Sequence, residues 1–592
     1  MIGIGFLVAS SAWAAKDLTT VQVVLNQVGY APADEKIALV ETNRDLIDVA
    51  AVARVLIQPG GTPALPAIPL DVDRKRYGNF RHQYAVDFSA LTTAGTYAVE
   101  IRDGSNALIA TSPPTVVAVD PLATIVPGLV RFFGVQRSGN TAPLVHAPSH
   151  LDDGVAVGGP QDGLAVDLAG GWYDAGDYIK FSLTTAYASF LQLFALRELA
   201  PAGLAASLRT AIRAEARIGL EYLLKAHPTA SAFYFQVADG LDHDSGDRLP
   251  ENDTAYGGPR PAYYGLGANT AGKAAAALAL GSEEWATDDP AFAAACLTAA
   301  QEIYALGKSI VEGTSTDPKF QLLVTCVETP AEYASDQLNC GFYNEDSWRD
   351  DMTIAAVTLY EASGSAPYLA DAVAFGTSLE AAYASLGLLN LHDEALYKLY
   401  AHLPASGAFT QADVMAQLQI DAERVRSRAL KDRYNAGQRS FLWGSAADMS
   451  GDAVTCLLYD KLAGDPQYRQ IARRQLDFLL GRNPFGVSLV AGAGTLYPLH
   501  PHHQVAKLMP AAWYASGNII GSLAGGLAKK SQYPFRGDPD LKAAVLGDTA
   551  SPFAPFEHGR FNYHDIAADY VSNEPALDSN SNLLAAVLGL MP

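Results

Sequence analysis

Two aspartates three residues apart are the first feature of this chain that could do chemistry. The nine residues from position 170 read Gly-Gly-Trp-Tyr-Asp-Ala-Gly-Asp-Tyr, so Asp174 and Asp177 lie between the aromatic residues Trp172 and Tyr178. Paired carboxylates can hold and deprotonate a water molecule, and aromatic rings stack on sugar faces, so this composition favours carbohydrate chemistry. The same spacing is also typical of a helix start, with Asp177 as the cap of the apolar run 181–199.

A second cluster of acidic and aromatic residues lies near the C-terminus. Residues 563–574 read Tyr-His-Asp-Ile-Ala-Ala-Asp-Tyr-Val-Ser-Asn-Glu and bring Asp565, Tyr570 and Glu574 close together in sequence. Because Pro575 follows, Glu574 could equally be a first-turn acid that complements a helix dipole. The residues alone leave catalysis and helix stabilisation both open.

Composition narrows the classes of partner. The chain has 592 residues, of which 49% are hydrophobic and 18% charged, as expected for a globular protein. Its net charge of −22 argues against nucleic acid and anionic membrane as partners, because both would repel it. Beyond the N-terminal segment we find no run of about 20 apolar residues, so no membrane span is predicted. A neutral or cationic ligand suits these properties.

The first fifteen residues, MIGIGFLVASSAWAA, are typical of a secretory signal peptide. An apolar run is followed by the small-x-small site Ala12-Trp13-Ala14, although the usual basic start is missing. A buried N-terminal strand is the alternative, but the run ends in small residues and turns polar at Lys16-Asp17. We therefore predict a secreted or periplasmic protein.

The four cysteines are consistent with that location. Cys326 and Cys340 flank an acidic, Pro-containing segment and could form a disulfide in an oxidising compartment. Cys296 and Cys456 lie in apolar helical runs and are expected to be buried thiols. The spacings support neither a zinc ribbon nor a redox motif.

The pattern of the chain changes near residue 120. Residues 16–119 contain six short β-like runs separated by Pro- and Gly-rich turns, which predicts an immunoglobulin-like sandwich: 21–25, 37–40, 52–57, 84–88, 95–101 and 115–119. Residues 120–592 contain Ala- and Leu-rich runs without intervening strands, which predicts a large all-α domain: 201–224, 269–280, 290–310, 352–361, 367–386, 412–430, 447–462 and 468–480. We expect function on its connecting loops.

Together, the two acidic clusters resemble the motifs of glycoside hydrolase family 9, the cellulase family with an α/α-barrel. The 170–178 block is similar to the family's N-terminal carboxylate loop. The C-terminal run is similar to a second family motif, whose positions are occupied by Tyr563, Asp565, Tyr570, Glu574, Ala576, Asn580 and Ser581. Further similar blocks lie at 259–263, 441–445 and 480–488, and residues 25–30 resemble the first strand of the immunoglobulin-like module found in many relatives.

The resemblance implies an all-α (α/α)6 barrel catalytic domain preceded by a small all-β immunoglobulin-like sandwich. It also implies an inverting β-glycosidase, in which Asp177 is the general base, Asp174 holds the attacking water and Glu574 is the general acid. Such a mechanism needs roughly 6.5–9.5 Å between acid and base. The residues expected to bind substrate are Trp172, Tyr178, His502, Asp565 and Tyr570.

The sequence departs from the family pattern at three positions. The family's Pro-His-His-Arg here reads Pro501-His502-His503-Gln504, so a neutral amide replaces a guanidinium and should hold sugar hydroxyls more weakly. Leu496 stands where a polar residue is expected, and Ser579 stands where an aromatic residue usually precedes Asn580. We expect a stacking surface to be lost there.

No cofactor is predicted to be required. The tract His500, His502 and His503 could bind a metal, but no Cys or carboxylate lies at ligand spacing nearby. Many relatives with the immunoglobulin-like module hold zinc. This chain has Ser138, Ser149-His150 and Tyr173 at the matching positions, so zinc is not expected.

Calcium is common in the family and remains possible in this chain. The acidic run 242–247 could supply oxygen ligands, although a solvated acidic loop is the simpler interpretation.

Three functions therefore remain in view. The first is an endoglucanase-like hydrolase of β-1,4-linked glucan polysaccharide or oligosaccharide. The second is an exo-acting β-glucosidase or β-glucosaminidase on short oligosaccharides, because Gln504 and Ser579 alter the expected sugar contacts. The third is a non-catalytic glycan-binding protein, which the presence of all three carboxylates disfavours. The small sandwich carries no evident aromatic stripe, so we interpret it as a structural support.

Overall fold

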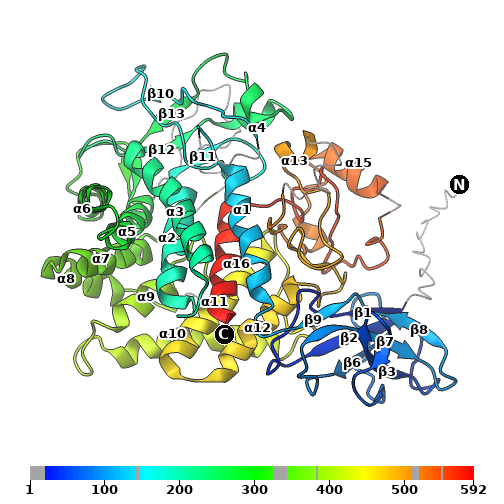
Figure 1. Ribbon diagram of the computed structural model, residues 1–592. Helices are drawn as coiled ribbons and strands as arrows, with labels where there is room; N and C mark the ends of the chain where they lie inside the picture. Colours follow the sequence, from blue (N-terminus) through cyan, green and yellow to red (C-terminus); the bar gives the residue numbers. More distant parts are fainter. Residues whose placement is uncertain are drawn as a thin grey trace, which may run out of the picture.

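The computed structural model describes residues 21–140, 146–323, 343, 345–381, 385–508, 519–548 and 551–592. The predicted signal segment 1–15 and the predicted pair Cys326 and Cys340 lie outside these residues. In Figure 1 the N-terminal strands lie to one side of a larger helical body. Within the described residues, no helix combines the length and the apolar character needed to cross a membrane.

The N-terminal strands form two sheets around a shared core. One sheet has the order β1 (Val21–Val24), β2 (Ile37–Thr42) and β6 (His82–Asp87). In the other, β3 (Val52–Gln58) and β7 (Gly95–Arg102) pair with four short strands: β4 (Thr62–Pro63), β5 (Ile68–Pro69), β8 (Leu108–Thr111) and β9 (Thr115–Val117). Alternating side chains such as Val40, Tyr84 and Val99 are fully buried between the sheets. Each of the six predicted β-runs overlaps one of these strands.

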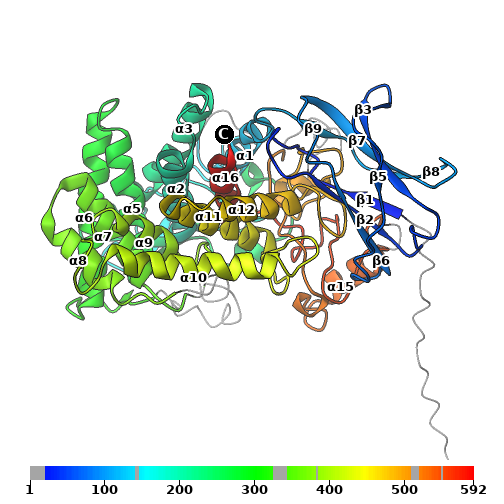
Figure 2. The same ribbon diagram turned by 90° about the horizontal axis from the view of Figure 1, so that it is seen from below.

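Six strongly buried helices form a closed inner ring in the helical body, each in contact with the next. In ring order they are α2 (Ser182–Phe194), α5 (Ala268–Glu284), α7 (Arg349–Ser363), α9 (His392–Tyr400), α11 (Ser445–Ala463) and α16 (Leu577–Leu590). More exposed helices pack outside them: α1 (Val126–Gln136), α3 (Ala206–Ala226), α6 (Pro290–Val311), α8 (Ala366–Gly376), α10 (Gln411–Ala429) and α12 (Pro466–Leu479). Figure 2 shows α10, α11 and α12 along one side of this double layer. The predicted all-α barrel is confirmed.

The structure corrects three local predictions. A small sheet interrupts the helices: β10 (Val155–Val157), β13 (Pro261–Tyr264), β12 (Tyr234–Val237) and β11 (Lys180–Phe181). The helix predicted over 367–386 ends at Gly376, where a side chain would meet Leu399 at 2.6 Å because another helix approaches closely. Asp177 does not cap the helix that follows, since α2 starts at Ser182 after an extended residue, Phe181.

The sandwich is fastened to the helical body near α12. The amide of Asn26 donates to the buried carboxylate of Asp477 at 2.9 Å. Arg474, on the same helix, donates twice to Glu35 at 2.8 and 3.0 Å. These contacts agree with a supporting role for the sandwich.

Candidate active site

A cavity of about 1640 Å³ opens at one end of the inner ring. Its wall includes the first residues of α7, α9, α11 and α16, so the N-terminal ends of several inner helices face the same space. The positive ends of helix dipoles favour negatively charged groups, which suits a cavity lined by many carboxylates. Asp174, Asp177 and Glu574 are all on this wall, together with His502 and Tyr570.

The loop that carries the two aspartates is fixed from both sides. The backbone N–H of Asp174 donates to the carbonyl of Ile179 at 3.0 Å, and its own carbonyl accepts from Leu577 at the start of α16, also at 3.0 Å. Gly171 adopts a left-handed conformation (φ +71°), and a side chain there would lie 2.7 Å from the ring of Tyr222. Only glycine fits this turn without strain.

Buried cations also hold this loop from beneath. Lys180 donates to the carbonyls of Leu168 and Gly170 at 2.6 and 3.1 Å, and Arg260 donates to the carbonyl of Tyr178 at 2.6 Å. Both cations pair with the buried carboxylate of Asp153 at 2.7 Å. The loop is therefore anchored by charge-assisted hydrogen bonds, which are stronger than neutral ones.

Gly176 brings the two ends of the chain together. Its backbone N–H donates to Oε1 of Glu574 at 3.2 Å across 398 residues of sequence. A Cβ atom at Gly176 would lie 3.0 Å from that oxygen and 2.7 Å from the carbonyl oxygen of His502. The small residue between Asp174 and Asp177 thus allows Glu574 to approach the loop.

Burial makes two of the three carboxyl groups weak acids. It raises the pKa of Glu574 to about 8, and the neighbouring charge of Asp177 raises it further. Burial likewise raises the pKa of Asp174 to about 7, although a hydrogen bond from Tyr343 lowers it. Oδ1 of Asp174 is buried, and a side-chain interaction with Thr184 also lowers the pKa of this group.

Asp177 has a different environment. Its Oδ2 lies 2.9 Å from Nδ1 of His243, which belongs to the short helix α4 (Gly240–Asp244). The hydrogen bond to Asp177 raises the pKa of His243 to about 9, so at neutral pH an imidazolium faces this carboxylate. The contact between Asp177 and His243 is a charge-assisted hydrogen bond. Sequence reasoning missed His243, because it lies in an acidic run that is typical of a solvated loop.

Aromatic and polar side chains complete the wall beside Glu574. Nδ1 of His502 donates to the carbonyl of Ala567 at 2.7 Å, and burial lowers the pKa of His502 to about 4, so its Nε2 is a neutral acceptor. The ring of Tyr570 lies 5.3 Å from that of Trp443, whose side chain is 48% exposed. Gln504 is also on the wall. Tyr343 and Trp443 were not predicted as site residues.

Three of the residues predicted to bind substrate lie elsewhere. Trp172 is fully buried against Phe133, and its indole N–H donates to Glu215 at 2.9 Å. Tyr178 is also fully buried, so neither ring is on the cavity wall formed by the described residues. Asp565 instead accepts the backbone N–H groups of residues 499 and 500, which fixes the segment leading to His502.

The residues that match the zinc-site positions of relatives do not fit that metal. The hydroxyl of Tyr173 lies 2.7 Å from that of Ser149 and 2.6 Å from Nδ1 of His150. Nε2 of His150 faces Asp253 at 3.0 Å, so both ring nitrogens already have partners. Burial raises the pKa of Tyr173, which keeps the phenol neutral. A hydrogen-bonded cluster with a single imidazole is a poor match to the thiolate and imidazole ligands of zinc.

The acidic run 242–247 does not converge on one point. Asp242 is buried and pairs with Arg248 and Arg260 at 3.0 and 3.3 Å, whereas Asp247 pairs with Lys507 at 3.0 Å. These carboxylates are balanced by side-chain cations. The run therefore gives no support for a shared calcium ligand set.

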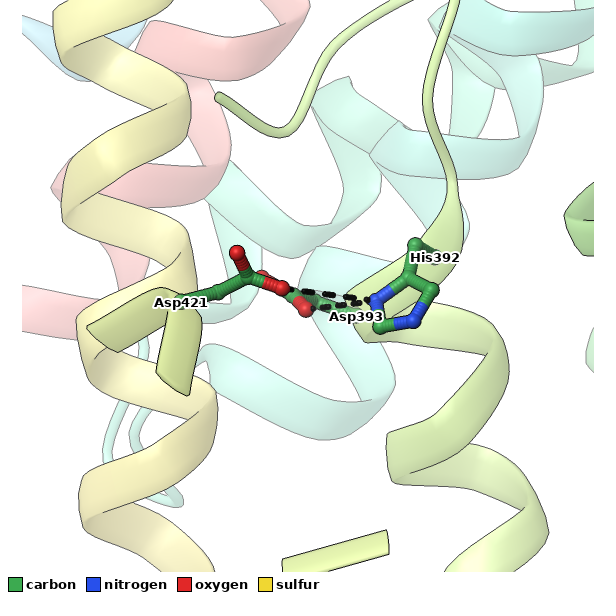
Figure 3. Close-up of side chains that lie close together, drawn as sticks. All are labelled: His392, Asp393 and Asp421. Atoms are coloured by element: carbon green, nitrogen blue, oxygen red, sulfur yellow. Dashed lines mark hydrogen bonds and ion pairs between the residues drawn. The ribbon is translucent and has the colours of Figure 1, made fainter. Parts of the chain in front are cut away.

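Figure 3 shows a separate cluster of side chains that could hold a metal ion, formed by His392, Asp393 and Asp421. Nδ1 of His392 faces Asp393 at 3.0 Å and Asp421 at 3.7 Å, and its Nε2 faces Oε1 of Gln417 at 3.2 Å. Burial lowers the pKa of His392, but Asp393 raises it more, so the net change is upward. Both ring nitrogens of His392 already have partners, so the cluster fits an internal hydrogen-bonded group.

Comparison with known proteins agrees with this geometry. Residues 124–587 match the family described as "Glycosyl hydrolase family 9", and residues 19–106 match "Cellulase N-terminal ig-like domain". The chain belongs to glycosyl hydrolase family 9. The predicted resemblance is confirmed, and with it the assignment of the chain to a glycosidase family.

Individual relatives of this family 9 protein carry endoglucanase names. This chain is 27% identical over 476 residues to "Endoglucanase B" of Cellulomonas fimi. The match covers 78% of this chain but only 41% of that protein. It is 28% identical over 495 residues to "Endoglucanase 19" of Oryza sativa subsp. japonica, covering 77% and 87% of the two chains. A metagenome-derived glycoside hydrolase family 9 endoglucanase has the same fold, with a TM-score of 0.76, 24% identity, and coverage of 96% and 99%.

Proposed function

We propose that this family 9 protein hydrolyses β-1,4-glucosidic bonds of cellulose-type glucans or their oligosaccharides, with inversion at the anomeric carbon. The single observation that carries the proposal is the contrast among the three carboxyl groups on one cavity wall. Glu574 is buried with a pKa of about 8, whereas Asp177 faces the imidazolium of His243. The cavity wall therefore offers Glu574 as a buried proton donor and Asp177, hydrogen-bonded to His243, as a candidate proton acceptor for the same bond.

The mechanism follows from these positions. Asp177 removes a proton from a water molecule that Asp174 helps to orient, and the water oxygen attacks the anomeric carbon. Glu574 donates its proton to the glycosidic oxygen as the bond to the leaving sugar breaks. Water is consumed, one reducing end is formed, and the two carboxyl groups exchange protonation states until solvent resets them.

The wall around these groups supports a chain of neutral sugars as substrate. Trp443 and Tyr570 offer aromatic surfaces near Glu574, and the neutral imidazole of His502 can accept a hydroxyl hydrogen bond. Substrate binding by Trp172, Tyr178 and Asp565 is not part of this proposal, because the two rings are fully buried and Asp565 accepts the backbone N–H groups of residues 499 and 500. The endoglucanase names of the relatives agree with the substrate class.

Product analysis tests the proposal. Proton NMR during hydrolysis of cellopentaose should show the α-anomer first, and viscosity of carboxymethyl cellulose should fall faster than reducing ends appear. Initial release of the β-anomer would contradict the inverting mechanism. Reducing ends without viscosity loss would indicate the exo-acting alternative, and binding of glycans without any cleavage would indicate the glycan-binding alternative.

We also propose that catalysis needs no metal, that the protein is secreted or periplasmic, and that the sandwich is a support. The first point rests on the hydrogen-bonded cluster around Tyr173 and the ion-paired carboxylates of the acidic run. The second rests on the signal-like N-terminal sequence. For the third point, the domain boundary is placed at 119/120. Truncation to residues 120–592 should lower the thermal stability of the protein and change its KM little.

A further inference from the structure

A lysine is buried among acidic residues at the edge of the cavity. Lys273, in α5, is fully buried, and its ammonium group lies 2.8 Å from Oε1 of Glu345 and 2.5 Å from Oδ1 of Asp351. Asp351 is in the first turn of α7, and Glu345 lies four residues before that helix. The lysine therefore joins α5 to the segment that leads into α7.

Helices α5 and α7 pack closely beside Lys273, which holds the lysine against the acidic residues. A Cβ atom at Gly272 would lie 2.5 Å from the backbone of Asp351, so α5 and α7 touch through a glycine beside Lys273. The two helices run next to each other in Figure 1 and in Figure 2. Such a close approach leaves the lysine side chain no route to solvent.

The cluster has more negative than positive groups. Asp350 is also buried and adds a third carboxylate near one ammonium. Oε2 of Glu345 and Oδ2 of Asp351 are buried without hydrogen-bond partners in the described part of the chain. Burial lowers the pKa of Lys273, but Asp351 and Glu345 raise it more, so the ammonium stays charged. Removing that charge would leave buried carboxylates uncompensated.

The segment held by Lys273 also touches the proposed reaction centre. The hydroxyl of Tyr343 donates to Oδ2 of Asp174, and its ring packs edge-on against Phe181 at 5.3 Å. Asp350 accepts the backbone N–H of Leu391 at 2.8 Å, which ties the same segment to the cavity wall on its other side. The position of Tyr343 against Asp174 thus depends on how firmly this segment is fixed.

We propose that Lys273 is a positioning residue. Its ammonium group holds Glu345 and Asp351 together and thereby keeps Tyr343 against Asp174. In the absence of the ammonium group, a divalent cation could take its place. Carboxylate oxygens in a flexible cluster are the ligands that Ca²⁺ prefers. The wild-type protein should therefore be indifferent to Ca²⁺, whereas a variant without the ammonium should bind it.

The test is a lysine deletion with cation rescue. In Lys273→Ala without divalent ions, we expect kcat to fall about tenfold to a hundredfold, as for other small misplacements of reacting groups, with little change in KM. Addition of CaCl₂ to 10 mM should restore at least a third of the wild-type kcat. Calorimetry with Ca²⁺ alone should show one site, with a Kd on the order of 0.1–1 mM, as in extracellular modules.

Two controls separate this effect from general damage. Lys273→Ala/Glu345→Gln removes a ligand and should neither bind nor respond to Ca²⁺. Lys308→Ala removes a partly exposed lysine that pairs with Asp371 at 2.7 Å and makes no ion pair with this cluster among the described residues, and it should keep wild-type kcat with no response to Ca²⁺. Wild type treated with EDTA should also be unchanged.

The outcomes are decisive in each case. Wild-type kcat in Lys273→Ala, or a folded variant that binds no Ca²⁺, would overturn the proposal. Failure to fold both with and without Ca²⁺ would also overturn it, because the ammonium would then do more than supply charge. The kinetic part rests on the proposed role of Asp174, but Ca²⁺ binding does not. Binding without rescue would therefore refute the positioning role while leaving the proposed hydrolysis intact.

Discussion

The two carboxylates proposed to act on one bond lie in regions built in opposite ways. The Asp177 loop rests on the buried cations Lys180 and Arg260, and Asp177 itself faces His243 at 2.9 Å. Glu574 instead is buried, with Asp177 as its main charged neighbour, and accepts one backbone N–H, from Gly176. The first region places cations against its carboxylates, whereas in the second burial has the largest effect on the pKa of Glu574.

This difference shows how one fold can keep an acid and a base side by side. A nearby cation stabilises a carboxylate in its ionised form, whereas desolvation stabilises the neutral form. The cavity does not need two different residue types, because the surroundings decide which carboxyl group holds the proton.

Removal of either carboxylate should have the largest effect. Asp177→Asn and Glu574→Gln should each lower kcat on cellopentaose by about 10²- to 10⁴-fold, the usual contribution of general acid–base groups. Circular dichroism should show wild-type folding, since both changes keep the side-chain volume. Unchanged hydrolysis by Glu574→Gln would mean that the catalytic assignment is wrong.

Removal of the imidazolium beside Asp177 should have the next largest effect. In His243→Gln we expect kcat to fall about 10²-fold or less, because Asp177 remains but loses its charged partner. The wild-type kcat/KM should decline as the pH rises through about 8, since Glu574 must keep its proton. His243 lowers the pKa of Glu574, so its loss should move this decline to higher pH. A profile that stays in place would refute the coupling between the two regions.

The exposed aromatic residue beside Glu574 should affect binding. Trp443→Ala should raise KM for cellopentaose about three- to tenfold, because an aromatic contact is worth about 0.5–1.5 kcal/mol. The value of kcat should change less than twofold, since Trp443 does not contact the carboxylates. A fall in kcat with constant KM would place this ring in the reaction step instead.

Substitution of the buried residue Trp172 should affect stability alone. Trp172→Phe removes the hydrogen bond to Glu215 and should lower the free energy of unfolding by about 1–3 kcal/mol. KM should remain within twofold of wild type, because the ring lies beneath the cavity. Urea unfolding and steady-state kinetics on one preparation would measure both quantities, and a large rise in KM would restore Trp172 as a substrate contact.

Strand alternation and helical runs were sufficient to predict a small sandwich and a large all-α domain, whereas the (α/α)6 barrel and the choice of Asp174, Asp177 and Glu574 followed from the resemblance to glycoside hydrolase family 9. Strand alternation and helical runs are local properties, so the sandwich and most of the barrel helices could be read directly. The ends of elements depended on packing, as at Gly376, where Leu399 of a neighbouring helix closes in.

Side-chain direction was not predictable in the same way. Trp172 and Tyr178 flank the aspartates in sequence, yet the turn at Gly171 directs them into the core. His243 and Tyr343 reach the aspartates from segments far away in sequence, and neither carries a local pattern that marks it. Proximity of this kind arises only when the ring of helices closes.

The most direct test of the central claim compares leaving groups. Aryl β-cellobiosides whose phenols range from poor to good leaving groups should be hydrolysed by Asp177→Asn with a uniform loss. Glu574→Gln should lose activity only on poor leaving groups and regain nearly wild-type rates on 2,4-dinitrophenyl β-cellobioside, which needs no proton. Equal losses for both variants across the series would contradict the assignment of Asp177 as base and Glu574 as acid.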